Sequence, residues 1–108
     1  MAAFKNFKGI LTTGNQTLYT APAGGALVFF GQVANVSASA LDVDCTLWWT
    51  DASAAGAITR LCYVMTAPAG GAFPLIAKGA LALEAGDTIV GIASANSSAE
   101  ASFSVYEL

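Results

Sequence analysis

The chain has 108 residues and a formal net charge of −3, and only 10% of its residues are charged, whereas about 25% is usual for a soluble domain. This length predicts a single domain, residues 1–108, which can bury a core without disulfides or metal. The four cations are scattered, so no nucleic-acid partner is expected, and no stretch approaches the ~18 apolar residues of a membrane-spanning helix.

Two aromatic side chains stand close together in the first residues of the chain. Phe4 and Phe7 alternate with lysines, and this stretch lacks the apolar run of a secretion signal. We therefore expect a protein that is made and folded in the cytoplasm. Residues 1–8 could form a short arm, with Phe4 and Phe7 docking on a neighbouring molecule.

The heptapeptide Thr-Ala-Pro-Ala-Gly-Gly-Ala occurs twice, at residues 20–26 and 66–72, and each copy joins one apolar run to another. Pro22 and Pro68 can preset φ at the second position of a turn, where glycines help the chain to reverse. A phosphate-binding loop is not expected, because neither copy precedes a helix. The repeat predicts two internally similar halves with equivalent corners, at which Pro22 and Pro68 are candidate contact residues.

Period-2 alternation predicts a hairpin in the middle of the chain, with strands over residues 41–49 and 58–66. The apolar face of the first strand consists of Leu41, Val43, Cys45, Leu47 and Trp49. If Thr50 lies opposite Ala57, Cys45 lies opposite Cys62. The two cysteines then fit either two buried free thiols or a cross-strand disulfide, which only geometry can distinguish.

Trp48 and Trp49 are adjacent, so in a strand they point to opposite faces. The alternation places Trp49 with the apolar set and Trp48 on the outer face. An outward Trp48 could anchor a protein interface or stack on a sugar, and the low charge favours the interface. The alternative is that both faces of the sheet are covered.

The remaining strand candidates are short runs separated by Gly, Pro, Asn, Asp and Ser. They cover residues 4–11, 16–20, 26–36, 73–78, 80–84, 88–95 and 99–108. About eight or nine short strands with turn residues between them are typical of an all-β protein. We predict an antiparallel β-sandwich of jelly-roll type with little or no helix.

The sequence offers little for catalysis or metal binding. It has no histidine, and its two cysteines alone cannot complete a tetrahedral zinc site. Its seven carboxylates follow no calcium-loop pattern, so surface positions are expected for them, including Asp42 and Asp44, which share a strand face. We predict a protein that is not an enzyme and has no catalytic residues, no cofactor and no metal.

Five segments together resemble small virion structural proteins of tailed bacteriophages. They are Leu18-Tyr-Thr-Ala-Pro-Ala-Gly, Val33-Ala-Asn, Trp49-Thr-Asp, Thr59-Arg-Leu and Leu83-Glu-Ala-Gly-Asp87. The resemblance covers nearly the whole chain and consists of the general character of these segments and their order along the chain. It implies a capsid decoration or cement protein in the virion, commonly a homotrimer, whose partner is the major capsid protein or another virion protein. It carries over no catalytic residues.

A small, weakly charged β-domain also suits a protein that binds a large lattice, where a modest contact per subunit is multiplied by avidity. The sequence therefore favours a structural virion protein that decorates the capsid. One alternative is a protein associated with the tail, neck or fibre of the virion. Another is a small carbohydrate-binding, receptor-binding module that presents Trp48 or Tyr106 on an exposed sheet face.

Overall fold

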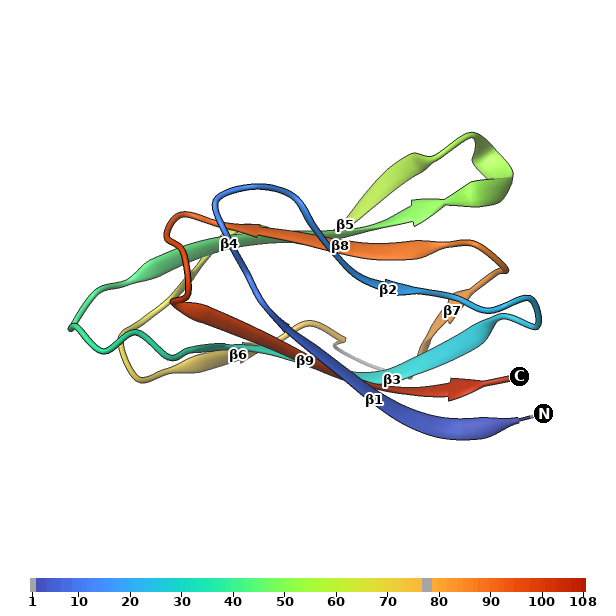
Figure 1. Cartoon of the computed structure of the whole chain (residues 1–108), viewed down its shortest axis with the longest axis horizontal. Helices are drawn as coiled ribbons and strands as arrows, with labels where there is room; N and C mark the ends of the chain where they lie inside the picture. The colour runs from blue at the N-terminus through green and yellow to red at the C-terminus, as the bar shows by residue number, and fades with distance from the viewer. Residues whose placement is uncertain (1, 77–78) are drawn as a thin grey trace.

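The computed structural model describes residues 2–76 and 79–108, which form two antiparallel sheets packed as a sandwich (Figure 1). The strands are β1 (Ala3–Ile10), β2 (Gln16–Thr20), β3 (Ala26–Asn35), β4 (Val43–Asp51), β5 (Ala57–Ala67), β6 (Ala72–Pro74), β7 (Leu81–Leu83), β8 (Thr88–Ala93) and β9 (Ala99–Glu107). One 3-10 turn, η1 (Ala52–Ala54), is the only helical element in these two ranges. The predicted all-β fold is confirmed.

The strand order identifies a jelly roll. One sheet has the order β1-β9-β3-β6, with β7 also paired to β3, and the other has the order β2-β8-β4-β5. The chain passes repeatedly from one sheet to the other, and its first and last strands pair side by side, as in a double Greek key. No helix among the described residues is long and apolar enough to span a membrane.

Alternation along the strands builds the core. In β9, Ala101, Phe103 and Val105 are buried while the residues between them face outward. In β4, Val43, Cys45 and Leu47 are buried, and Trp49 packs against the same core, as predicted. Leu41 differs from the prediction, because it precedes β4 and is exposed.

The predicted register of the central hairpin is wrong by one residue. Thr50 pairs with Ile58 rather than Ala57, and two irregularities farther along place Cys45 opposite Met65 and Cys62 opposite Leu47. Each β-bulge adds a residue to one strand only, so a constant pairing sum cannot describe this ladder. The predicted opposition of the two cysteines is therefore also wrong.

Two expected strands are shorter than predicted. The run 73–78 contributes only β6 and the run 80–84 only β7, and both pieces lie along the same side of β3. Residues 77–78 lie outside the described residues. Between the two pieces, the backbone nitrogen of Leu75 donates to the carbonyl oxygen of Gly31 at 2.9 Å. This edge of the sheet is therefore interrupted beside Phe29, Phe30 and Gly31.

The N-terminal segment is part of the sheet. From Ala3 to Ile10 the chain pairs with β9 along its whole length, so residues 3–8 are not a free arm, and this expectation is corrected. The reason lies in the alternation of β1. It turns Phe7 inward to partial burial while Phe4 stays outside, 74% exposed.

The two heptapeptide copies both lead from the four-stranded sheet to the five-stranded sheet. In each copy, the proline carbonyl accepts a hydrogen bond from the second glycine, at 2.9 Å from Gly25 and 2.8 Å from Gly71. Pro22 and Pro68 therefore occupy the first position of the turn, not the second. Positive φ falls on Gly25 in the first copy but on Gly70 in the second, so one sequence adopts two turn geometries.

The two corners lie at opposite ends of the sandwich. The first corner leads directly into β3, whereas Gly71 of the second accepts a hydrogen bond from Asn35 at the far end of that strand (Figure 1). The first copy feeds a central strand and the second feeds the edge strand β6. The existence of two internally similar halves stays a prediction.

Candidate interaction surface

The five residues predicted to make contacts do not form one site. Phe4 lies on the outer face of the five-stranded sheet, and Phe7 points into the core. Trp48 is half-buried on the outer face of the four-stranded sheet, where it pairs with Val90 and with an arginine of β5. Pro22 is half-buried and Pro68 exposed, each at its own corner. Their roles in binding stay predictions.

The outer side of the five-stranded sheet carries an apolar group that we call the aromatic face. It consists of Phe4, Leu27, Phe29, Phe30 and Tyr106. The ring of Phe4 packs on that of Tyr106, with 4.7 Å between centroids, and meets the edge of Phe29 at 6.0 Å. An exposed group of this kind is characteristic of an interaction site.

A bulge in β3 creates this face. The pairing of β3 with β9 shifts between Val28 and Phe30, so Phe29 is the additional residue. Val28 and Gly31 are buried on either side of the bulge, and both phenylalanines are left exposed. Sequence reasoning included them in the strand 26–36 but missed their exposure. Regular alternation would have placed one of them in the core.

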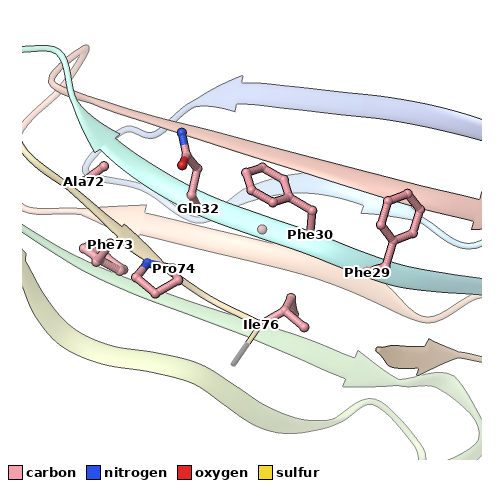
Figure 2. A pocket seen from close by; sticks show the side chains of 8 residues that line it. Phe29, Phe30, Gln32, Ala72, Phe73, Pro74 and Ile76 are labelled. Carbon is pink, nitrogen blue, oxygen red and sulfur yellow. The ribbon is translucent and has the colours of Figure 1, made fainter. Parts of the chain in front are cut away.

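A hollow of about 210 Å³ opens beside the aromatic face, at the interrupted edge between β3 and β6 (Figure 2). Phe29 and Phe30 project from β3, and Pro74 and Ile76 stand on the other side. We call it the apolar hollow, because its accessible lining is mainly carbon. Such a pocket suits an apolar side chain of a partner.

A second hollow, of about 350 Å³, lies on the other side of Phe30. It runs between β1 and β9, and its outward side chains are Asn6, Lys8, Ser102 and Ser104. The hydroxyl of Ser104 donates to the side-chain oxygen of Asn6 at 3.2 Å. We call it the polar hollow. It combines hydroxyl, amide and ammonium groups with one aromatic rim, a pattern that the sequence did not reveal.

Phe7 is held in a three-ring stack that closes one side of the sandwich. Its ring lies 4.4 Å from that of Tyr19 and 4.6 Å from that of Phe103, nearly parallel to both. The hydroxyl of Tyr19 donates to Glu107, whose other oxygen forms an ion pair of 2.9 Å with Lys5. These contacts tie β1, β2 and β9 together, so Phe7 supports the structure.

The same contacts perturb two ionisations. Burial, followed by the hydrogen bond to Glu107, holds the pKa of Tyr19 well above its usual range. The hydrogen bond from Tyr19, followed by that from Lys5, lowers the pKa of Glu107. Tyr19 therefore stays protonated as a donor and Glu107 ionised as an acceptor over the neutral range.

The edge strand β5 carries a strained bulge. Val64 has φ of +46°, a conformation that β-branched residues rarely adopt, and its backbone nitrogen donates to Oγ1 of Thr46 at 2.9 Å. Tyr63, Val64 and Met65 are exposed there, and the guanidinium of Arg60 lies 4.9 Å from the centre of the Tyr63 ring. The bulge interrupts the ladder and hinders edge-to-edge pairing along this strand.

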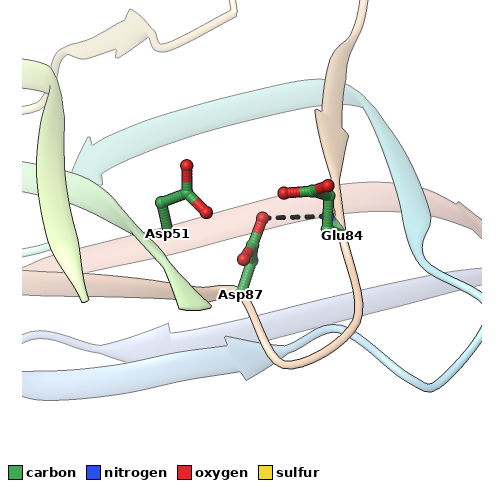
Figure 3. Close-up of side chains that lie close together, drawn as sticks. All are labelled: Asp51, Glu84 and Asp87. Carbon is green, nitrogen blue, oxygen red and sulfur yellow. Dashed lines mark hydrogen bonds between the residues drawn. The ribbon is translucent and has the colours of Figure 1, made fainter. Parts of the chain in front are cut away.

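Three carboxylates meet where the β4–β5 hairpin approaches the β7–β8 turn: Asp51, Glu84 and Asp87 (Figure 3). Asp87 is buried, and each of its oxygens accepts one backbone hydrogen bond of 2.8 Å, from Ala52 and from Glu84. The Ser53 hydroxyl lies 2.7 Å from an oxygen of Asp51 and 2.9 Å from one of Glu84, and its single proton is shared between these two acceptors. These hydrogen bonds join the β4–β5 hairpin to the β7–β8 turn, so the cluster acts as a structural clamp between them.

Cys45 and Cys62 are both free thiols. The sulfur of Cys62 lies 3.6 Å from the carbonyl oxygen of Cys45, to which it donates. Burial, with smaller contributions from Cys62 and Asp44, raises the pKa of Cys45 to about 11, and burial also raises the pKa of Cys62. At neutral pH neither sulfur is the thiolate that nucleophilic chemistry requires.

Comparison with known proteins shows similarity of fold without a sequence family. No protein-family model matches the chain, and no curated protein matches it significantly. A chain of the acid-stable capsid structure of Helicobacter pylori bacteriophage KHP30 is similar, with a TM-score of 0.61 and 13% identity over 99% of this chain and 87% of that one. A chain of the disulfide-linked pili of Bacillus endospore appendages has a TM-score of 0.56 and 9% identity over 99% and 86%. At such identities the likeness concerns the fold.

Proposed function

We propose that this protein is a non-enzymatic structural protein of a bacteriophage virion. In this proposal it is a decoration or cement protein that binds the major capsid protein lattice as a homo-oligomer, a homotrimer in the form that the sequence resemblance suggests. Its place is the virion, after synthesis in the cytoplasm of the host bacterium. This role requires no cofactor, because it consists of binding and includes no chemical reaction.

The main observation behind the proposal is that many apolar side chains lie outside the core and are exposed. The jelly roll has a filled core, yet it exposes the aromatic face on one sheet and Tyr63, Val64 and Met65 on the other. The chain as a whole has few charged residues, 10% of the sequence. Two separate apolar surfaces on a small rigid domain suit a subunit that contacts both its own copies and a lattice.

Two comparisons support this proposal. The chain shares its fold over nearly its whole length with a chain from a phage capsid structure, and the sequence resemblance concerns small phage virion proteins as well. The pilus subunit also belongs to an assembly of many copies. A fold can host many functions, so the fold supports this proposal only together with the exposed surfaces.

Co-sedimentation tests the proposal. Purified protein is mixed with phage heads that lack it and, separately, with purified tails. We expect saturable binding to heads at a fixed number of copies per capsid. Saturable binding to tails alone would instead favour the tail, neck or fibre alternative, and binding to neither would refute a virion role.

A carbohydrate-binding module is the second candidate, and the polar hollow favours it. Asn6, Ser102 and Ser104 offer hydrogen-bond partners for sugar hydroxyls, and Phe30 lines the same hollow. Trp48 is a poorer platform than expected, because it is half-buried. A glycan array tests this candidate: binding that is lost in Ser102→Val would support it, whereas an array without binding would exclude the glycans tested.

A further inference from the structure

We propose that copies of this chain associate through the outer face of the five-stranded sheet, with the Phe4 ring of one copy seated in the apolar hollow of another. This inference rests on one part of the proposed function, the homo-oligomer, and adds the surface and the residues that form it. It does not depend on whether the capsid is the partner of the oligomer.

Phe4 has the properties of an interface anchor. It is 74% exposed, the highest value among the exposed large apolar residues of the described chain. Its position is nevertheless fixed, because β1 pairs with β9 on both sides of it and its ring rests on Tyr106 and Phe29. A ring that is held in place loses little conformational freedom on binding.

The apolar hollow fits such a ring in size and chemistry. Its volume is about 210 Å³, and apolar cavities of about 150 Å³ already accommodate benzene. Phe29, Pro74 and Ile76 supply carbon surface around it, and Phe30 forms one wall. Aromatic anchors that fill apolar pockets dominate the energetics of many interfaces.

The positions of ring and hollow favour a second copy as the occupant. Phe4 lies on β1 and the hollow lies between β3 and β6, toward opposite margins of one sheet with the order β1-β9-β3-β6. Within its own chain, Phe4 contacts Phe29 at the near rim of the hollow, with 6.0 Å between ring centroids, but it does not line the hollow. When one copy places its Phe4 side chain in the hollow of the next, each copy uses both its Phe4 and its hollow. A rotation between copies can then close the assembly into a cyclic oligomer.

The exposed area and the charges of the outer face of the five-stranded sheet are compatible with a second copy as its partner. At roughly 200 Å² per large side chain, the aromatic face exposes about 400 Å² of apolar surface, half of the ~800 Å² per partner of a standard interface. Uncharged polar residues such as Gln32 and Ser104 extend the same face. Its far end carries one cation, Lys8, and one anion, Glu100, so like copies do not repel there although the chain is acidic.

Light scattering with size-exclusion chromatography tests the inference on the full chain. We expect wild-type protein to be oligomeric and Phe4→Ser to be monomeric at the same concentration. Tyr63→Ser is the matched control, because Tyr63 is 69% exposed but lies on β5 of the other sheet, and it should leave the mass unchanged. A monomeric wild type, or a Phe4→Ser oligomer of unchanged mass, would overturn the inference.

Cysteine trapping provides a second test that does not rely on loss of assembly. Phe4→Cys and Pro74→Cys proteins are mixed under mild oxidation and the products are separated without reductant. We expect a cross-linked dimer in the mixture and much less in either variant alone or in wild type. Equal cross-linking in all samples would contradict the ring-in-hollow contact. Wild-type monomers that still bind phage heads would overturn this inference while leaving the capsid proposal intact.

Discussion

The buried carboxylate of Asp87 gives the sharpest test of how the hairpin and turn are joined. Asp87→Ala removes both acceptors of the backbone N–H groups of Ala52 and Glu84. A hydrogen bond to a charged group contributes ~1.5–3 kcal/mol, and removing the Asp87 carboxylate also relieves its repulsion with Asp51 and Glu84, which lie within 4.8 Å. We therefore expect a loss of about 2–4 kcal/mol in the free energy of unfolding, or very roughly 10–25 °C in Tm for a chain of this size.

Asp87→Asn keeps the shape of the side chain but leaves only one acceptor oxygen, so its amide nitrogen faces one of the two backbone N–H groups. We expect it to lose about half of the unfolding free energy that Asp87→Ala loses, or slightly more. Urea unfolding at constant slope measures both values. Asp42→Ala is the control, because this exposed carboxylate accepts one longer bond of 3.2 Å from Ala69 and should cost within ~0.5 kcal/mol. Losses below that limit in both Asp87 variants would refute the clamp, and a Tm that rises on adding Ca²⁺ to wild type would show that the cluster binds metal.

Three further predictions concern the ring stack, the strained bulge and the carboxylate near the termini. Phe7→Ala should lower the free energy of unfolding by about 2–4 kcal/mol, because it removes the middle ring of a stack, whereas Phe4→Ala should change it by less than ~1 kcal/mol; similar losses in chemical denaturation would contradict their assigned positions. Val64→Gly should raise stability by about 0.5–1 kcal/mol because it relieves a positive φ, while Met65→Gly on the same strand should lower it, and thermal melts that show a loss for both would remove the strain argument. The pKa of Glu107 is lowered in the folded protein, so its contribution is present above the ordinary glutamate range and is lost as pH falls through the folded value; Glu107→Gln should therefore show a smaller fall in Tm on acidification, and parallel wild-type and variant profiles would contradict this linkage.

Much of the fold follows from local pattern. The alternation in β4 identified its buried face and the opposite orientations of Trp48 and Trp49, because a strand with one core face needs alternate apolar residues. The spacing of turn residues identified a sandwich. Neither pattern depends on distant parts of the chain.

The interaction surface could not be predicted, because it depends on irregular pairing. The bulge at Phe29 and the interruption between β6 and β7 arise from how β3 fits two neighbours at once. In the hairpin, the register is already displaced by one residue at Thr50, and the bulges in the edge strand β5 displace it further toward Cys45. Phe4 was singled out for its aromatic character, but only the pairing of β1 with β9 distinguishes it from the buried Phe7.

The heptapeptide shows the same limit in a single motif. Both copies form a turn with the same hydrogen bond, which the sequence specifies locally. They differ in which glycine takes positive φ and in their surroundings, because Gly24 and Gly25 lie against the C-terminal residue and the carbonyl of Leu83, whereas the position that a Cβ of Gly70 would occupy is open. Tertiary contacts therefore decide the conformation of identical sequences.

An electron cryomicroscopy reconstruction of phage heads with and without this protein tests the central claim most directly. We expect difference density of the size of this sandwich at symmetry-related positions on the capsid lattice. Absence of such density from saturated heads, or its presence on the tail alone, would contradict the assignment of a capsid decoration protein.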